Sequence, residues 1–213
     1  MLLAAATAMF SASCENDNIN PYDYVGNNGN ANQGSTNVIK TAVAEYPVGS
    51  LVWSNDTTLS ESVEIPVGTS LYIEPGVTVT CKADVQVPVE VVVLGNLYCL
   101  GTAEKPVTFT SDRKKPEAWG GIICGYNSEE VVLNHVEIAY AGATPTESSA
   151  SFQNKLFKTT IDGGVPAFHF CNVNGKFVIA NSFFHDNYND QTYFTGGNGV
   201  IAGNIFADSG NAA

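Results

Sequence analysis

A ten-residue pattern occurs twice near the end of the chain, at a spacing that strongly limits the possible folds. "VIANSFFHDN" begins at Val178, and "VIAGNIFADS" begins 22 residues later at Val200, with five of the ten positions identical. A fixed period of this length, built from short apolar pieces and turn residues, is the signature of a solenoid. One coil cannot bury its own apolar face, so the coils above and below must cover it. The repeat therefore predicts a β-solenoid in which no coil is stable by itself.

Short apolar pieces of period two continue through the chain from Ile39 onward. In "SLYIEPGVTVT", for example, Leu71 and Ile73 fall on one face of an extended segment. Pieces of this kind, separated by Gly, Pro, Asn or Asp, indicate half-buried strands. Asn-Gly signals for hairpins are sparse, so we expect each strand to pair with a partner other than its neighbour in sequence. This pattern of short strands therefore favours an all-β chain.

Further matches extend the repeat and set the expected size of a coil. "VVLNHVEI" from Val131 aligns with "VIANSFFH" from Val178 at an offset of 47, which we interpret as two coils and a small excess. One apolar pair recurs at offsets of 26 and 25 residues, as Leu71 and Ile73, Leu97 and Cys99, and Ile122 and Cys124. These offsets predict coils of about 22–26 residues, with the drift absorbed by corner loops. The longest candidate loops are residues 111–118 and 143–165.

Two stretches carry a resemblance to a known family. The first runs from Trp53 to Val77 and contains "VEIPVGTSLYIEPGV", and the second is "LGNLYCLGTAEKPVTFTS" followed by "WGGI" at residues 119–122. Together they resemble the bacterial right-handed parallel β-helix proteins of the pectin-lyase-like superfamily, over about residues 45–213. The resemblance implies a right-handed parallel β-helix, which also agrees with the handedness of parallel crossovers. The motifs are specific for the fold and not for an activity.

Asparagines recur close to the expected turns. Asn134, Asn181 and Asn204 occupy related places in the repeats. Stacked asparagine amides can hydrogen-bond from coil to coil. Alternatively, each asparagine adopts the left-handed backbone of a turn. The sequence leaves both readings open.

The N-terminus has the features of a targeting segment. A short apolar run from Leu2 to Phe10 precedes "SASC", which ends at Cys14. The run is too short to span a bilayer, which needs about 20 residues, and it reads as a secretory signal. The segment resembles a bacterial lipobox, which implies cleavage before Cys14 and lipidation of its thiol. Ser11 stands where the lipobox commonly has Leu, and no Lys or Arg precedes Cys14, so we expect the true start to lie upstream of the first Met.

These features divide the chain into three parts. Residues 1–13 are expected to be a lipoprotein signal peptide, 14–38 a flexible Asn- and Gly-rich tether, and 39–213 the β-helix domain. "ENDN" after Cys14 resembles the export signal of surface lipoproteins in Gram-negative gut commensals. We therefore expect a lipid-anchored protein of the outer membrane, displayed on the cell surface. The chain stops after an apolar piece without a polar cap, so we expect the domain to be incomplete at this end.

The charge balance excludes one class of partner. The chain has 9 Lys and Arg residues against 21 Asp and Glu residues, a formal net charge of −12. Nucleic acids would be repelled, because phosphate binding needs clustered Lys and Arg. Arg113, Lys114 and Lys115 form the one dense basic group, in an expected corner loop. The charge indicates an acidic, soluble surface; the alternative is contact with cations or a basic partner.

The cysteines and histidines give no metal or catalytic motif. Four cysteines follow the lipobox, at Cys81, Cys99, Cys124 and Cys171. An oxidising exterior permits disulfides, but Cys99 and Cys124 fall at inward positions, where we expect buried free thiols. No CxxC or Cys/His spacing predicts zinc. The histidines are widely separated, at His135, His169 and His185.

The functional prediction is a non-catalytic, carbohydrate-binding surface protein. Paired-carboxylate and Gly-His-Gly motifs of polygalacturonase-like enzymes are missing, and an acidic protein matches an acidic polymer poorly. Tyr188, Tyr193 and Phe194 are candidate glycan contacts, although they could instead cover the coil edge. No cofactor is predicted, with Ca²⁺ at Asp186 and Asp190 as an alternative. The other readings are a fragment of a polysaccharide lyase or glycoside hydrolase, and an adhesin-like structural protein.

Overall fold

The computed structural model of the protein describes residues 46–156 and 163–210. Almost all regular structure in this part of the chain is strand, arranged in three sheets whose neighbouring strands are never consecutive in sequence. The predicted signal peptide (1–13), the whole of the predicted tether (14–38) and residues 39–45 of the predicted domain lie outside the described residues. No helix in the described segments is long and apolar enough to cross a membrane.

Each sheet takes one strand from each successive coil, and all the pairs are parallel. Sheet A contains β1 (Leu51–Trp53), β4 (Ser70–Ile73), β7 (Asn96–Leu100), β10 (Glu130–Asn134), β13 (Lys176–Ala180) and β16 (Asn198–Ala202). Sheet B contains β2 (Thr57–Leu59), β5 (Thr78–Cys81), β8 (Val107–Ser111), β11 (Val136–Ala139), β14 (Phe183–His185) and β17 (Ile205–Phe206). Sheet C contains β3 (Val63–Ile65), β6 (Val91–Val93), β9 (Ile122–Cys124), β12 (Phe168–Phe170) and β15 (Thr192–Phe194).

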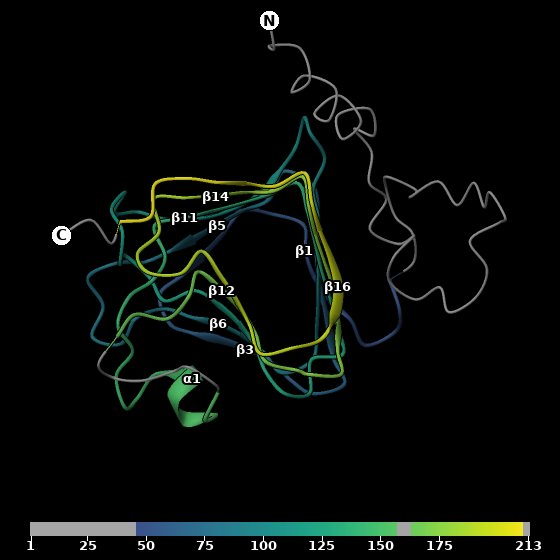
Figure 1. Ribbon diagram of the computed structural model, residues 1–213, viewed down its shortest axis with the longest axis horizontal. Helices are drawn as coiled ribbons and strands as arrows, with labels where there is room; N and C mark the ends of the chain where they lie inside the picture. The colour runs from purple at the N-terminus through teal and green to yellow at the C-terminus, as the bar shows by residue number, and fades with distance from the viewer. Residues whose placement is uncertain (1–45, 157–162, 211–213) are drawn as a thin grey trace, which may run out of the picture.

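The chain visits sheets A, B and C in turn and then begins the next coil, so that the three sheets enclose one core (Figure 1). This path confirms the prediction of an all-β, right-handed parallel β-helix. It also explains the scarcity of hairpin turns, because each strand pairs with the strand one full coil away.

The register confirms the central repeat. Val178 lies directly opposite Val200 on adjacent parallel strands, and Leu71 lies opposite Leu97. One predicted pairing is wrong. The strand that follows β7 in sheet A is β10, so Cys99 lies opposite Leu133 and not opposite Cys124. The pair at Ile122 belongs to sheet C instead. A period-two apolar pair looks the same in all three sheets, so the pattern alone could not assign it to the correct one.

The offset of 47 is also corrected. Val132, and not Val131, lies opposite Val178, so the true offset is 46. The two strands are immediate neighbours in sheet A, and the interval is one coil with a long insertion, not two coils. Coil lengths therefore exceed the predicted 22–26 residues wherever a corner loop is long.

The long excursions all leave the coil at one corner. Residues 82–90, 112–121 and 140–167 each connect sheet B to sheet C. The two loops predicted from the sequence overlap the second and third of these. The third carries the only helix of the described segments, α1 (Ala150–Gln153), which lies beside the outer side of sheet C (Figure 1). There Leu156 and Val165 pack on the outward side chains of the sheet.

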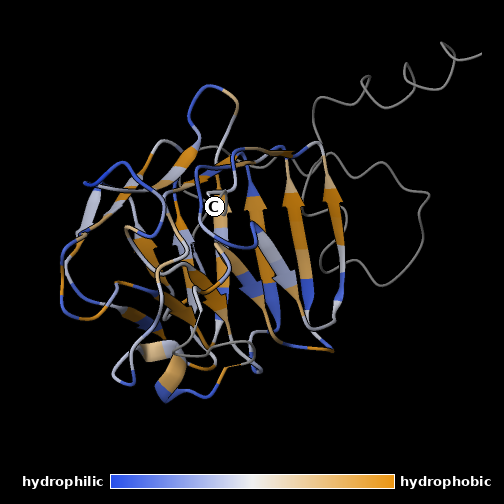
Figure 2. Ribbon diagram, turned by 60° about the vertical axis from the view of Figure 1, so that its left-hand side comes forward, coloured by the Kyte–Doolittle hydropathy of each residue, from blue (hydrophilic) through white to orange (hydrophobic). Residues whose placement is uncertain are grey.

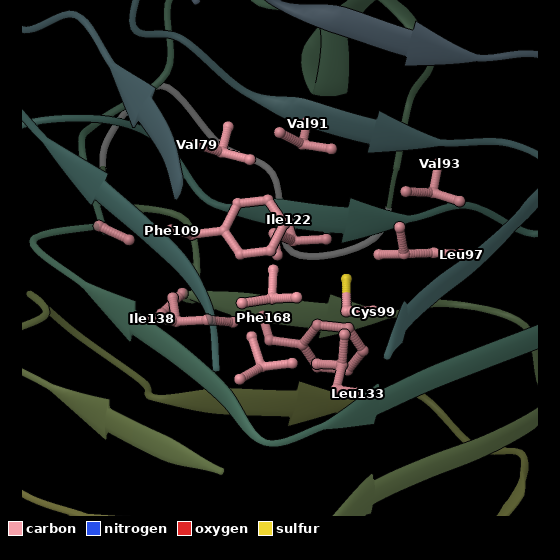
Figure 3. Packing of buried hydrophobic residues seen from close by; sticks show 14 of the residues in the cluster. Val79, Val91, Val93, Leu97, Cys99, Phe109, Ile122, Leu133, Ile138 and Phe168 are labelled. Carbon is pink, nitrogen blue, oxygen red and sulfur yellow. The ribbon is translucent and has the colours of Figure 1, made fainter. Parts of the chain in front are cut away.

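The core is a stack of inward side chains from all three sheets. Figure 3 shows aliphatic and aromatic residues from successive coils meeting at its centre, among them Phe109, Leu133 and Phe168. Figure 2 shows that the strands are largely hydrophobic, whereas the loops that connect them are mostly hydrophilic. Cys99 lies within this stack, the thiols of Cys81, Cys99 and Cys124 are buried and free, and Cys171 is buried as well. Burial raises the pKa of the Cys99 thiol, which keeps it protonated and inert.

At the corner between sheets A and B, successive coils each contain a residue whose backbone is in the left-handed conformation. His135, Asn181 and Gly203 fill this position with φ values of 49°, 52° and 65°. The Asn181 side chain also donates to Asn134 Oδ1 of the preceding coil at 3.2 Å. Both readings of the asparagines therefore hold for Asn181. Asn204 does not continue the ladder, because its amide binds the backbone of the coil beneath it.

Candidate functional site

The outer face of sheet B carries a row of side chains that runs parallel to the helix axis. Strand pairing places these residues in register as Thr78, Thr108, Glu137, Phe183 and Ile205. In the first four of these strands the adjacent side chains, among them Val79, Phe109, Ile138 and Phe184, point into the core. We call these five positions the sheet B row. Successive positions are separated by the distance between paired strands, about 4.8 Å.

One end of the row opens into a shallow hollow of about 470 Å³. It lies at the corner between sheets A and B, and its wall includes the row residues Thr78 and Thr108. The charged pair Glu104 and Lys105 completes the opposite side. The hollow and the row therefore form one continuous surface.

A cluster of polar and aromatic groups occupies the middle of this surface. His185 Nδ1 lies 2.7 Å from Asp186 Oδ2, and His185 Nε2 lies 3.1 Å from Glu137 Oε1. The imidazole can donate to both carboxylates at once only in its protonated form. The Phe183 ring stacks on the imidazole at a centroid distance of 4.1 Å. We call Glu137, Phe183, His185 and Asp186 the His185 cluster.

The corner loops bring a cation and a further ring to the cluster. Tyr140 directly follows β11 with φ of 66°, and it meets His185 edge-on at 6.1 Å. Lys114, from the loop 112–121, donates to Thr110 Oγ1 at 2.6 Å and lies 5.3 Å from the centre of the Tyr140 ring. Two of the three long excursions thus each contribute one residue to the border of the cluster.

The geometry of the His185 cluster fits the binding of a ligand better than catalysis by proton transfer. A general base needs a nitrogen directed at the substrate, but both nitrogens of His185 are held by carboxylates. The Phe183 side chain, in contrast, is directed away from the core and is 37% exposed. An aromatic face with hydroxyl and carboxylate groups beside it can pack on a ring and accept hydrogen bonds from it.

The predicted glycan contacts do not share one surface. Phe194 packs on Phe177 at 4.6 Å and on Phe168 at 6.0 Å, so it is directed toward the core. Tyr193 meets the buried His169 edge-on, on the outer side of sheet C. Tyr188 lies in the loop after β14, where its backbone N–H donates to Ala141 O. A single ligand therefore cannot bind the three rings together along one face.

The residues suggested for Ca²⁺ have other contacts. Asp186 pairs with His185, and the Asp190 carbonyl accepts from the backbone of Ala167. No group of three or more His, Cys, Asp and Glu side chains within the described segments is arranged to hold a metal ion. The lipidation residue Cys14 lies outside the described residues.

The other histidines are parts of the fold. His169 Nε2 lies 3.6 Å from Cys171 Sγ, and both residues are completely buried. His135 occupies the left-handed corner already described, and burial lowers its pKa. The sequence did not reveal Phe183 and Glu137 as site residues, because the assumed offset of 47 pairs Glu137 with the inward Phe184. A slip of one residue exchanges the two faces of a strand.

The fold and this surface define a right-handed parallel β-helix with one polar and aromatic outer face. The model of the pectate-lyase-like β-helix domain family matches residues 47–154, about half of the chain, and the chain belongs to this family. No curated protein and no solved structure gives a significant match to the chain.

Proposed function

We propose that this protein is a lipoprotein of the outer membrane, anchored through Cys14, whose β-helix binds a glycan at the cell surface without cleaving it. The binding surface is the sheet B row together with the hollow at its end. The observation that carries the proposal is the exposed Phe183 ring, held in place by His185 and followed in register by the polar side chains of Glu137 and Thr108.

The dimensions of the row support an extended glycan. Its positions repeat at about 4.8 Å, close to the length of one pyranose ring in an extended chain. A glycan lying along the helix axis would therefore present a similar group to each coil. Phe183 would pack against one ring, and the hydroxyl and carboxylate groups of Thr108 and Glu137 would hydrogen-bond its neighbours.

A glycan array followed by titration calorimetry tests the binding claim. The protein is the full chain, and the variants are Phe183→Ala and the matched control Tyr126→Ala, whose ring is 49% exposed on a different corner. We expect Phe183→Ala to weaken binding about tenfold, because the packing of an aromatic ring contributes roughly 0.5–1.5 kcal/mol beyond the area that it buries. If the two variants bound the glycan with equal affinity, the sheet B row would not be the binding site. Release of shorter or unsaturated products would overturn the non-catalytic part of the proposal.

The anchor is tested separately in cells. Fatty-acid labelling and surface accessibility to protease are expected for the wild-type protein and lost in Cys14→Ser. The lipid would supply the membrane affinity, because several acyl chains together hold a protein at the bilayer almost permanently. Labelling that persists in Cys14→Ser would contradict anchoring at this residue.

A further inference from the structure

The two carboxylates of the His185 cluster remain accessible beside the exposed aromatic ring. Glu137 and Asp186 each direct one oxygen to His185, yet their side chains are 38% and 43% exposed. A carboxylate has two oxygens and about four acceptor positions, so each retains acceptor capacity toward solvent. A ligand that packs on Phe183 therefore meets two negatively charged acceptors.

The cations around the cluster are engaged by the protein. Lys114 is held between the Thr110 hydroxyl and the Tyr140 ring. Arg113 pairs with Asp84 at 2.7 Å. In the same corner, Lys82 pairs with Asp112 at 2.9 Å. Arg113 and Lys82 are thus neutralised by carboxylates of their own, whereas Lys114 keeps its charge on the Tyr140 side of the cluster. With a protonated His185 between them, Glu137 and Asp186 together still carry one net negative charge beside Phe183.

We infer that the sheet B row binds an amino-bearing glycan and discriminates against polyuronates; this inference rests on the proposed function. A protonated amine on a sugar would form charge-assisted hydrogen bonds with Glu137 and Asp186. A uronate carboxylate in the same place would be repelled, and the protein's formal net charge of −12 adds to that repulsion. The site therefore has the opposite charge preference from one built for acidic pectic polymers.

The experiment compares three ligands on the full chain by titration calorimetry: chitosan oligosaccharides, their fully N-acetylated equivalents and oligogalacturonates. The first two share a backbone, so their difference isolates the amine. We expect chitosan oligosaccharides to bind about tenfold more tightly than the acetylated series, since two exposed ion pairs each contribute modestly. The preference should weaken as salt is raised. Oligogalacturonates should bind the least well.

Variants separate the site from the general charge of the protein. Glu137→Gln with Asp186→Asn should abolish the preference for the amine and leave affinity for the acetylated series. The control pair, Glu129→Gln with Glu147→Gln, removes the same charge from two exposed positions elsewhere and should leave the preference intact. Far-ultraviolet circular dichroism and thermal unfolding confirm that each variant is folded.

The outcomes distinguish this inference from the proposed function. Binding to none of the three ligands, nor to any glycan on the array, would overturn both. Equal affinity for the amine and acetylated series, or tighter binding of oligogalacturonates, would overturn the charge preference and leave glycan binding in place. A loss of preference in the control pair would assign the effect to overall charge and likewise overturn the inference.

Discussion

A single buried carboxylate holds the largest corner loop in place. Glu90 is fully buried, and its two oxygens accept from the backbone N–H and the hydroxyl of Ser151, at 2.8 and 2.5 Å. Ser151 lies in α1, 61 residues along the chain. Burial raises the pKa of the Glu90 carboxyl, and the hydrogen bonds from Ser151 oppose the shift only in part. Glu90 thus stabilises the position of the helix at the cost of burying a charge.

We expect Glu90→Gln to match or exceed the wild-type protein in stability at neutral pH. The amide oxygen can accept from the Ser151 N–H while the amide nitrogen donates to the Ser151 hydroxyl oxygen, so both contacts are kept and the buried charge is removed, an exchange worth about 1–3 kcal/mol. Because the folded-state pKa is raised, the carboxyl favours the folded state most below its ordinary value of 4.5, and this contribution is lost as pH rises through the folded-state pKa. Urea unfolding from that value to neutral pH should show this decline in the wild-type protein and not in Glu90→Gln.

Glu90→Ala provides the contrasting variant. It leaves Ser151 without its acceptors and opens a cavity, so we expect a loss of about 2–4 kcal/mol. If Glu90→Ala and Glu90→Gln were equally stable, the contact with Ser151 would not hold the loop.

At the scale of the elements, an asparagine joins two coils at the corner between sheets B and C. Asn187 is fully buried, and its Oδ1 accepts from Ala141 N at 2.8 Å. Its Nδ2 donates to Ile138 O at 2.9 Å and to Gln191 Oε1 at 2.6 Å. The side chain thus satisfies the backbone where β11 ends and the longest excursion begins. This contact fixes the point from which the loop leaves the coil.

We expect Asn187→Ala to destabilise this corner by about 2–4 kcal/mol, because two buried backbone groups lose their partners. Hydrogen exchange at the Ala141 amide should accelerate before that of the core strands, since the loss is local. Asn174→Ala, at an exposed position in another loop, is the control and should change neither quantity. Unaltered protection at Ala141 in Asn187→Ala would show that the backbone does not depend on the side chain.

The strand pairings differ in how well they can be predicted from the sequence. The pairing of Val178 with Val200 was readable because the coil between them has no insertion and the local pattern is intact. The pairing of Val132 with Val178 was missed by one residue, because residues 140–167 separate the two strands. Since a one-residue slip exchanges the faces of a strand, the same error hid Glu137 from the site.

The contacts that define the candidate site cross large sequence separations. Glu137 and His185 are 48 residues apart, and neither lies in a motif that marks it as a contact. Glu90 and Ser151 are unconnected by any periodic signal. The repeat predicts which residues face inward or outward, but the corner loops that bring polar groups together depend on tertiary packing. The fold was therefore readable from the sequence and the site was not.

At the scale of the whole molecule, each coil is stabilised by the coils on both sides. Leu133 on β10 lies between Cys99 and Ile179 of the adjacent coils and is fully buried. Ile201 on β16 continues the same inward column, opposite Ile179, and remains 48% exposed. The same type of side chain is therefore covered on both sides in a central coil and on one side in the last described coil. Stability should follow this difference in coverage.

We expect Leu133→Ala to cost about 2–5 kcal/mol, as for other large buried aliphatic residues. Ile201→Ala should cost about 1 kcal/mol or less, because roughly half of its surface is already in contact with solvent. Urea unfolding, followed by the fluorescence of the buried Trp119 and by circular dichroism, measures both variants on the same chain. Similar losses at the two positions would mean that the last described coil is as well packed as the centre, which would contradict a stack stabilised by contacts between neighbouring coils.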